Sequence, residues 1–179
     1  MRGMAQMGCP FTGVLYAGLM LTKDGPKLIE YNTRFGDPEC QVLMMRLQSD
    51  LAGIMLACAK GELARTAPQF RPDTALTVVM AANGYPGTLA KGGSIGGIAA
   101  AEAEGAKVFH AGTTRDAGGA LVASGGRVLN VTARGSSVRD AQSRAYAAVD
   151  QLAFPDGFCR RDIGAREVAR EAAGTSNPA

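Results

Sequence analysis

Two apolar, β-prone runs near the N-terminus constrain the fold of this chain more than any other feature. Residues 14–21 and 27–31 carry mostly apolar side chains, and Asp24-Gly25 lies between them. Asp-Gly between two such runs is a strong signal for an antiparallel β-hairpin. The apolar stretch of residues 11–21 is too short to cross a bilayer as a helix. We therefore expect a hairpin whose first strand is buried.

The pattern changes to a helical period after this hairpin. Asp37 and Pro38 suit the N-cap and the first position of a helix, and Asp50 can cap a second one. Gly61 is a typical stop signal. Between these signals apolar residues recur at three- and four-residue spacing, as on one helix face: Leu43, Leu47, Leu51, Ile54, Met55 and Cys58. We expect two consecutive helices.

The second half of the chain is typical of short strands joined by glycine turns. We expect strands at residues 75–82 and 107–110. Gly125-Gly126 separates two apolar runs, residues 120–124 and 128–132, which predicts a second hairpin.

A single amphipathic helix is expected near the C-terminus. Ser137 and Asp140 predict a capping box at its start. One face of the helix is apolar: Val138, Ala141, Ala145, Val149 and Leu152. Residues 170–179 have the character of a flexible tail.

The charge balance and the cysteines exclude several classes of function. Lys and Arg number 19 and Asp and Glu number 16, which gives a formal net charge of +3, and Trp is absent. A single-strand nucleic-acid binder needs a basic groove with stacking aromatics, so we expect no nucleic-acid partner and, without a membrane segment, no membrane partner. The four cysteines form no CxxC pair and one His is present. We expect no zinc site and a reducing, cytoplasmic environment.

Two other features do not support a functional interpretation. The glycine-rich stretch of residues 92–97 lacks the GxxxxGK[ST] spacing of a phosphate-binding loop. We interpret His110, the single histidine, as a structural residue at the end of a strand.

Glu30 and Asn32 are the residues that most suggest chemistry. They stand two apart on the second expected strand, so both side chains point to one face. A carboxylate and an amide carbonyl suit Mg²⁺, which takes one or two protein oxygens and completes its shell with phosphate and water. Arg34 shares that face if the strand continues, and it can hold a phosphate. The alternative is an exposed polar strand end before a turn.

The same residues carry a resemblance to a known family. Residues 30–34 resemble the Glu-x-Asn-x-Arg strand of ATP-grasp ligases. Residues 34–41, Arg-Phe-Gly-Asp-Pro-Glu-Cys-Gln, are similar to the signature octapeptide of glycinamide ribonucleotide synthetases, also called phosphoribosylamine–glycine ligases. Further stretches resemble that family in the same order: residues 11–20, 84–87, 108–113, 125–129 and 161–164. The resemblance covers nearly the whole chain.

The resemblance implies a fold, a reaction and a set of site residues. The fold is α+β: residues 1–70 form the C-terminal part of an ATP-grasp domain, and residues 71–169 form a small β-rich domain with one packed helix. The tail expected at residues 170–179 lies outside the resemblance. The reaction joins 5-phosphoribosylamine to glycine with ATP as co-substrate, through glycyl phosphate, in de novo purine biosynthesis. Glu30 and Asn32 then bind Mg²⁺ or Mn²⁺ and ATP, and Arg34 stabilises the transferred phosphoryl group.

The departures from the family pattern bear on activity. The chain begins inside the family's ATP-grasp domain, and residues 14–21 contain no second acidic metal ligand. We therefore expect a fragment that is inactive alone, whose partners are ATP, glycine, 5-phosphoribosylamine and a missing N-terminal half. Loss of sheet neighbours would leave the first strand with an apolar edge prone to self-association. The alternative function is a non-catalytic binding or structural module derived from such a ligase.

Overall fold

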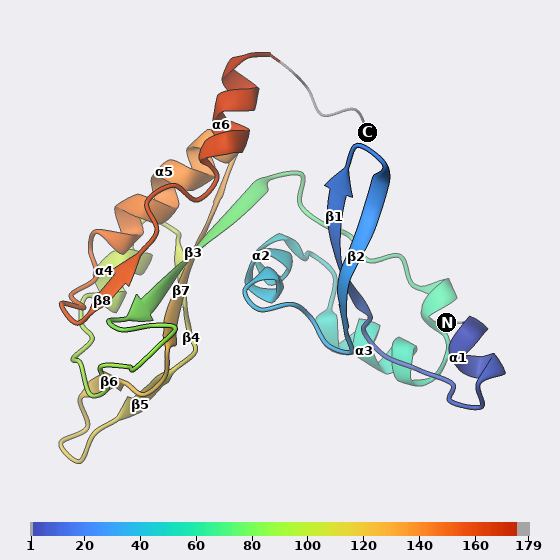
Figure 1. Cartoon of the computed structure of the whole chain (residues 1–179), viewed down its shortest axis with the longest axis horizontal. Helices are drawn as coiled ribbons and strands as arrows, with labels where there is room; N and C mark the ends of the chain where they lie inside the picture. Colours follow the sequence, from blue (N-terminus) through green and yellow to red (C-terminus); the bar gives the residue numbers. More distant parts are fainter. Residues whose placement is uncertain (1, 175–179) are drawn as a thin grey trace. The chain divides into compact units, whose positions relative to one another are not determined.

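The computed structural model describes residues 2–174, which form two compact units (Figure 1). The first unit contains the described residues up to Cys40 together with Leu47–Arg71. The second contains Gln41–Arg46 and the described residues from Pro72 onward. The chain combines helices with antiparallel strands, which confirms the expected α+β class. None of the described helices is both long and apolar enough to cross a membrane.

The first unit is built around the expected hairpin. β1 (Tyr16–Thr22) and β2 (Gly25–Asn32) pair antiparallel, with Tyr16 opposite Asn32. The register shifts after Gly18, where a β-bulge places an extra residue in β2. The other elements of this unit are α1 (Arg2–Gln6), α3 (Leu51–Ala59) and the 3-10 helix η1 (Leu63–Arg65).

The first strand is exposed, so the prediction that it is buried is wrong. In β1, Leu19, Met20 and Leu21 are 53%, 55% and 82% exposed. The sheet contains two strands within the described part of the chain, so neither a third strand nor a packed layer covers these side chains. The apolar run predicts the strand correctly because strand formation is local, whereas burial depends on what packs against it.

Two helices follow the hairpin, as the apolar period predicts. α2 (Glu39–Arg46) begins one residue later than Pro38, the first helical position expected from the sequence. α3 has the expected cap, because the Asp50 carboxylate accepts hydrogen bonds from two backbone N–H groups of the first turn at 3.1 and 2.9 Å. Gly61 lies just beyond this helix with a φ of +72°, a conformation that glycine adopts without strain.

A four-stranded antiparallel sheet forms the second unit, in the order β4-β7-β3-β8 (Figure 1). The strands expected at residues 75–82 and 107–110 are confirmed. The sheet consists of two long central strands and two short edge strands: β3 (Thr74–Ala82), β7 (Arg127–Gly135), β4 (Lys107–His110) and β8 (Gly157–Cys159). The remaining elements are α4 (Ile98–Glu102), β5 (Thr113–Arg115), β6 (Leu121–Ala123), α5 (Val138–Val149) and α6 (Ala165–Ala172).

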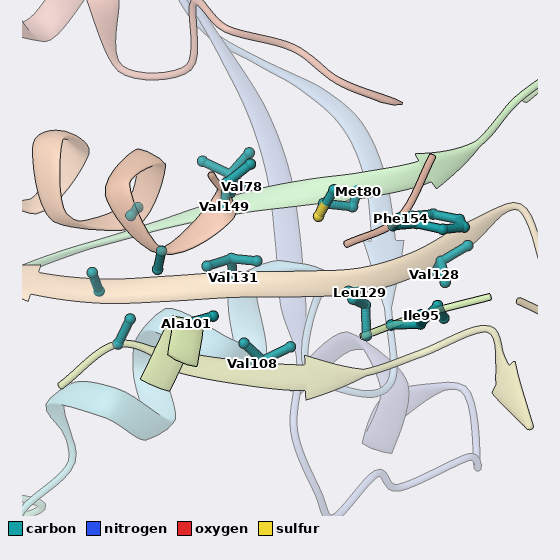
Figure 2. Close-up of a cluster of buried hydrophobic side chains, with 14 of the residues drawn as sticks. Val78, Met80, Ile95, Ala101, Val108, Val128, Leu129, Val131, Val149 and Phe154 are labelled. Carbon is teal, nitrogen blue, oxygen red and sulfur yellow. The ribbon is translucent and has the colours of Figure 1, made fainter. Parts of the chain in front are cut away.

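The core of the second unit lies between this sheet and α5. Figure 2 shows Val149 of α5 close to Val78 of β3 and Val131 of β7. The apolar face expected for this helix is confirmed: Ala141, Ala145 and Val149 are buried, and Val138 and Leu152 pack at its margin. Because burial stabilises by about 25 cal/mol per Å² of apolar surface, this layer is the main source of stability in the unit.

The second expected hairpin, across Gly125-Gly126, is wrong. β6 pairs with β5, whereas β7 pairs with β3 and β4. The turn that joins β5 to β6 is organised by Asp116, whose Oδ1 accepts two backbone hydrogen bonds of 2.9 Å. Gly125-Gly126 instead carries the chain from one sheet to the other, and the N–H groups of Ser124 and Gly125 donate to the carbonyl of Gly112. A two-glycine turn permits a hairpin but does not select the strand partners.

The C-terminal helix α6 extends into residues 170–179, where the sequence analysis expected a flexible tail. Residues up to Ala172 belong to α6, so this unit contains more than the one packed helix expected, and residues 175–179 lie outside the described residues. The Glu171 carboxylate anchors α6, because it accepts hydrogen bonds from the N–H groups of Val138 and Arg139 at 2.9 and 3.2 Å. A carboxylate is favourable there because the start of α5 carries a partial positive charge.

Candidate functional site at the end of the hairpin

Glu30 and Asn32 lie side by side at the end of β2, as the strand alternation predicts. Nδ2 of Asn32 donates a hydrogen bond of 2.9 Å to Oε1 of Glu30, so both side chains occupy one face of the hairpin. Among the described residues, no hydrogen bond joins Oε2 of Glu30 or Oδ1 of Asn32 to the protein. Two hard oxygen atoms are therefore available on this face.

A glycine of β1 makes room for the Glu30 side chain. Gly18 lies directly opposite Glu30 in the register. A Cβ atom at Gly18 would lie 3.2 Å from Cγ of Glu30, which is tighter than an ordinary contact. The missing side chain at Gly18 thus leaves room for the Glu30 side chain next to β1.

Tyr16 and Glu39 extend the same face. Tyr16 lies opposite Asn32, and its hydroxyl donates a hydrogen bond of 3.0 Å to Oε1 of Glu39 at the start of α2. A Cβ atom at Gly36 would clash with Oε2 of that carboxylate. Sequence reasoning did not identify Tyr16 or Glu39 as site residues. The available signals were the place of Glu39 in the octapeptide and the two-residue spacing from Tyr16 to Gly18.

The two carboxylates act on the Tyr16 hydroxyl in the same direction. The hydrogen bond to Glu39 and the charge of Glu39 raise the pKa of Tyr16, and the charge of Glu30 adds a smaller contribution. The phenol therefore stays protonated at neutral pH and acts as a hydrogen-bond donor.

The strand does not continue to Arg34, so the condition under which Arg34 was expected on the same face is not met. β2 ends at Asn32, so the alternation that would place Arg34 on the same face does not extend to it. Its Nη1 donates a hydrogen bond of 2.8 Å to the carbonyl oxygen of Phe35. Arg34 is exposed and is held by its own turn.

The donor set fits a cation that shares its shell with phosphate. Within residues 2–174, no group of three or more His, Cys, Asp or Glu side chains forms a protein-only metal cage. Mg²⁺ does not need one, because it is usually bound through one or two carboxylates plus substrate phosphates and water. Glu30 and Asn32 provide one carboxylate and one amide oxygen, which suit such an ion.

Three N–H groups of the glycine-rich loop at residues 92–97 are engaged within the fold. The N–H groups of Gly92, Ile95 and Gly96 donate to the carbonyl oxygens of Ala123, Leu121 and Ala153 at 2.8 to 2.9 Å. A phosphate-binding loop needs such N–H groups to point at the ligand. The loop is a structural connection.

His110 is the last residue of β4, where a structural histidine was expected. Its Nδ1 lies 3.1 Å from Oγ1 of Thr113.

Two family models match the chain, one over the hairpin and one over the second unit. Residues 1–40, which include Glu30 and Asn32, match the model described as "Phosphoribosylglycinamide synthetase, ATP-grasp (A) domain". The hairpin site is therefore of the ATP-grasp class. Residues 75–166 match "Phosphoribosylglycinamide synthetase, C domain". The chain belongs to the phosphoribosylglycinamide synthetase family, which confirms the resemblance seen in the sequence.

Curated relatives agree with this assignment. The chain is 64% identical over 97% of its length to the phosphoribosylamine–glycine ligase of Mesorhizobium japonicum. It is 55% identical, again over 97% of its length, to the chloroplastic phosphoribosylamine–glycine ligase of Arabidopsis thaliana. It spans 40% of the first relative and 34% of the second.

Two solved structures are similar to the chain, one in sequence and fold and the other in fold alone. The phosphoribosylamine–glycine ligase of Thermotoga maritima matches 90% of this chain with a TM-score of 0.78 and 33% identity, and the match covers 39% of that structure. The urea carboxylase of Kluyveromyces lactis matches 88% of the chain with a TM-score of 0.56 at 17% identity, which shows a shared fold alone.

Proposed function

We propose that this chain is the C-terminal part of a phosphoribosylamine–glycine ligase, an ATP-dependent carbon–nitrogen ligase of de novo purine biosynthesis. The observation that carries the proposal is the Glu30–Asn32 pair, which presents two hard oxygens on one strand face of an ATP-grasp region. Residues 1–70 would supply the end of the ATP-grasp domain, and residues 71–169 the C-terminal domain. The four cysteines are free, in agreement with a reducing cytoplasm.

In this proposal Glu30 and Asn32 hold Mg²⁺ or Mn²⁺ against the phosphates of ATP. The bound ion supplies charge neutralisation at the transferred phosphoryl group. The protein contributes position: the Asn32 amide fixes Oε1 of Glu30, and Gly18 leaves the space in which Glu30 lies. Side chains fixed in this way lose less freedom when the ion and nucleotide bind.

The proposed reaction has two steps. A carboxylate oxygen of glycine attacks the γ-phosphorus of ATP, and ADP leaves, which gives glycyl phosphate. The amine nitrogen of 5-phosphoribosylamine then attacks the glycyl carbonyl carbon, phosphate leaves, and the nitrogen releases a proton to solvent. Arg34 binds the transferred phosphoryl group, for which its guanidinium exchanges its hydrogen bond to Phe35.

A metal titration tests the role of Glu30 in this chain directly. The probe is Mn²⁺, followed by the loss of the electron paramagnetic resonance signal of the free ion. Glu30→Gln should weaken Mn²⁺ binding by roughly tenfold or more, because even indirect partners of a metal cost this much. Glu62→Gln is the matched control, since Glu62 precedes η1 and makes no side-chain capping hydrogen bond. Equal affinity in Glu30→Gln and the wild type would remove the metal from the proposal.

An activity assay tests the ligase assignment. The 179-residue chain alone should release no ADP in the presence of ATP, glycine and 5-phosphoribosylamine. Co-expression with the part of the Mesorhizobium japonicum ligase that this chain does not match should produce ADP release that depends on both substrates. No release from the assembled pair would favour the non-catalytic module.

A further inference from the structure

A six-residue segment, residues 33–38, joins the end of β2, which carries the Glu30–Asn32 pair, to Glu39 at the start of α2. Arg34 is the single cation in this segment, and its side chain is exposed. A connecting segment samples many conformations unless its ends and its interior are fixed. The position of Arg34 relative to the pair therefore depends on what holds residues 33–38.

Tyr16 fixes both ends of this segment. Its backbone lies opposite Asn32 in the antiparallel register, which holds the end of β2. Its hydroxyl donates a hydrogen bond of 3.0 Å to Oε1 of Glu39, which holds the start of α2. One residue of β1 thus braces the two points between which residues 33–38 run, and closing a loop in this way removes conformational freedom from it.

The interior of the segment packs against the Glu39 side chain. Gly36 is buried, and a Cβ atom there would clash with the Glu39 carboxylate. The carbonyl oxygen of Gly36 accepts a hydrogen bond of 2.8 Å from the N–H of Cys40 in the first turn of α2. Glu39 therefore covers Gly36 while it is bonded to Tyr16, and Gly36 is two residues from Arg34.

We infer that Tyr16 and Glu39 are positioning residues: their hydrogen bond holds the segment so that Arg34 meets the phosphates of a bound metal–polyphosphate. This inference rests on the proposed function for the roles of Arg34 and of the metal-binding pair. A preorganised guanidinium loses less freedom when it binds, so the bond raises the affinity for polyphosphate. The affinity for the metal ion alone does not depend on it, since the bond between Asn32 and Glu30 lies within β2.

Two probes separate these affinities: Mn²⁺ alone, and the preformed one-to-one complex of Mn²⁺ with tripolyphosphate. Loss of the electron paramagnetic resonance signal of the free ion measures the first, and equilibrium dialysis measures the second. Tyr16→Phe should bind Mn²⁺ as the wild type does and bind the complex about fivefold more weakly, as expected for the loss of one hydrogen bond. Tyr31→Phe is the matched control, because Tyr31 pairs with Ala17 on the other face of the same hairpin. It should bind both probes like the wild type.

Variants of Glu39 separate the hydrogen bond from the charge. The amide oxygen in Glu39→Gln can accept the same bond from Tyr16, whereas Glu39→Ala removes the acceptor. Glu39→Gln should therefore bind the complex nearly as the wild type does, and Glu39→Ala should resemble Tyr16→Phe. If Glu39→Gln bound the complex as weakly as Tyr16→Phe, charge and not position would be acting, and the inference would be overturned. Tyr16→Phe and Glu39→Gln change few atoms, so they decide the question even if Glu39→Ala does not fold.

A double-mutant cycle shows whether the bond acts through Arg34. Arg34→Ala should weaken binding of the complex. Adding Tyr16→Phe to it should cause no further loss, because the guanidinium that is being positioned is already absent. A bond that merely stabilised the fold would give additive losses instead. Circular dichroism of each variant checks that its helix and sheet content is unchanged.

Three further results would overturn the inference: unchanged binding of the complex by Tyr16→Phe, an equal loss for Mn²⁺ alone, or additive losses in the cycle. Each of them leaves the proposed function in place, because the wild type still binds both probes. Failure of the wild type to bind either probe would instead remove the metal site of the proposed function, and this role with it.

Discussion

The hydroxyl of Tyr16 on β1 donates a hydrogen bond of 3.0 Å to Oε1 of Glu39, the first residue of α2. This bond ties the strand opposite Asn32 to the start of the helix. Because the Glu39 carboxylate raises the pKa of Tyr16, Glu39→Gln should lower that pKa toward its ordinary value. The tyrosinate absorbance in a titration above about pH 10 should then shift to lower pH.

Two controls make this titration specific. Burial also raises the pKa of Tyr146, so two tyrosines contribute to the late part of the titration. Tyr16→Phe should remove the contribution of Tyr16 and so identify it. Glu62→Gln alters an acidic residue of the same unit without touching Tyr16, so its titration should match that of the wild type. An unchanged curve for Glu39→Gln would show that the bond does not persist in solution.

A second prediction concerns Asn130, a buried residue of β7 that is 1% exposed. Neither Oδ1 nor Nδ2 of Asn130 has a hydrogen-bond partner among the described residues. Replacing an unpaired buried amide by a similar apolar side chain removes a desolvation cost, so Asn130→Leu should raise the free energy of unfolding by about 1–2 kcal/mol. Urea denaturation followed by circular dichroism measures the change.

Thr132, two residues further along the same strand, is the matched contrast. Its Oγ1 donates a hydrogen bond of 2.8 Å to Oγ1 of Thr77, and the residue is fully buried. Thr132→Val keeps the shape and breaks a satisfied bond, so it should lower the free energy of unfolding by about 1 kcal/mol. If Asn130→Leu were as destabilising as Thr132→Val, the amide would have to be satisfied in solution.

A third prediction concerns acid stability at the start of α5. Ser137 accepts a hydrogen bond from the Asp140 N–H, as the capping box predicts, but the Asp140 carboxylate bonds the N–H of Ser136 instead of returning to Ser137. That bond and the ion pair with Arg144 lower the pKa of Asp140. A carboxyl group whose pKa is lowered by folding stabilises above its unfolded pKa, and this stabilisation is lost as the pH falls through the folded pKa.

Asp140→Asn should therefore be less stable than the wild type near pH 7, and the difference should shrink as the pH falls through the lowered pKa of Asp140. Thermal unfolding at a series of pH values measures both. A gap between Asp140→Asn and the wild type that persists in acid would assign the effect to packing and not to charge.

A fourth prediction ranks the thiols by reactivity. Burial raises the pKa of Cys159 and, with a further contribution from the charge of Asp37, that of Cys40, whereas Cys9 is exposed. Since the thiolate is the nucleophile, iodoacetamide at about pH 8 should modify Cys9 before Cys40 and Cys159. Peptide mass spectrometry of a time course measures the order. Unfolding in urea should abolish the ranking; a ranking that survives it would reflect local sequence.

Local sequence signals predicted the elements on which the site is built. The Asp24-Gly25 turn, the two-residue spacing of Glu30 and Asn32 and the Asp50 cap each act within a few residues. The turn, the side-chain pair and the helix cap that they predict therefore depend little on the rest of the chain. Pairings between distant segments behaved differently: the Gly125-Gly126 signal was as strong as the first one, yet β7 pairs with β3 and β4.

The sequence by itself determined the hairpin, its two-faced alternation and the placing of Glu30 beside Asn32, because backbone geometry alone imposes a period of two on a strand. Only the tertiary structure decided that Tyr16 meets Glu39, that Glu171 caps α5, and that no described residue covers Leu19 and Leu21 of β1. These relationships join residues that are far apart in the chain or depend on the absence of a covering layer. They arise from the packing of whole elements, which no local pattern specifies.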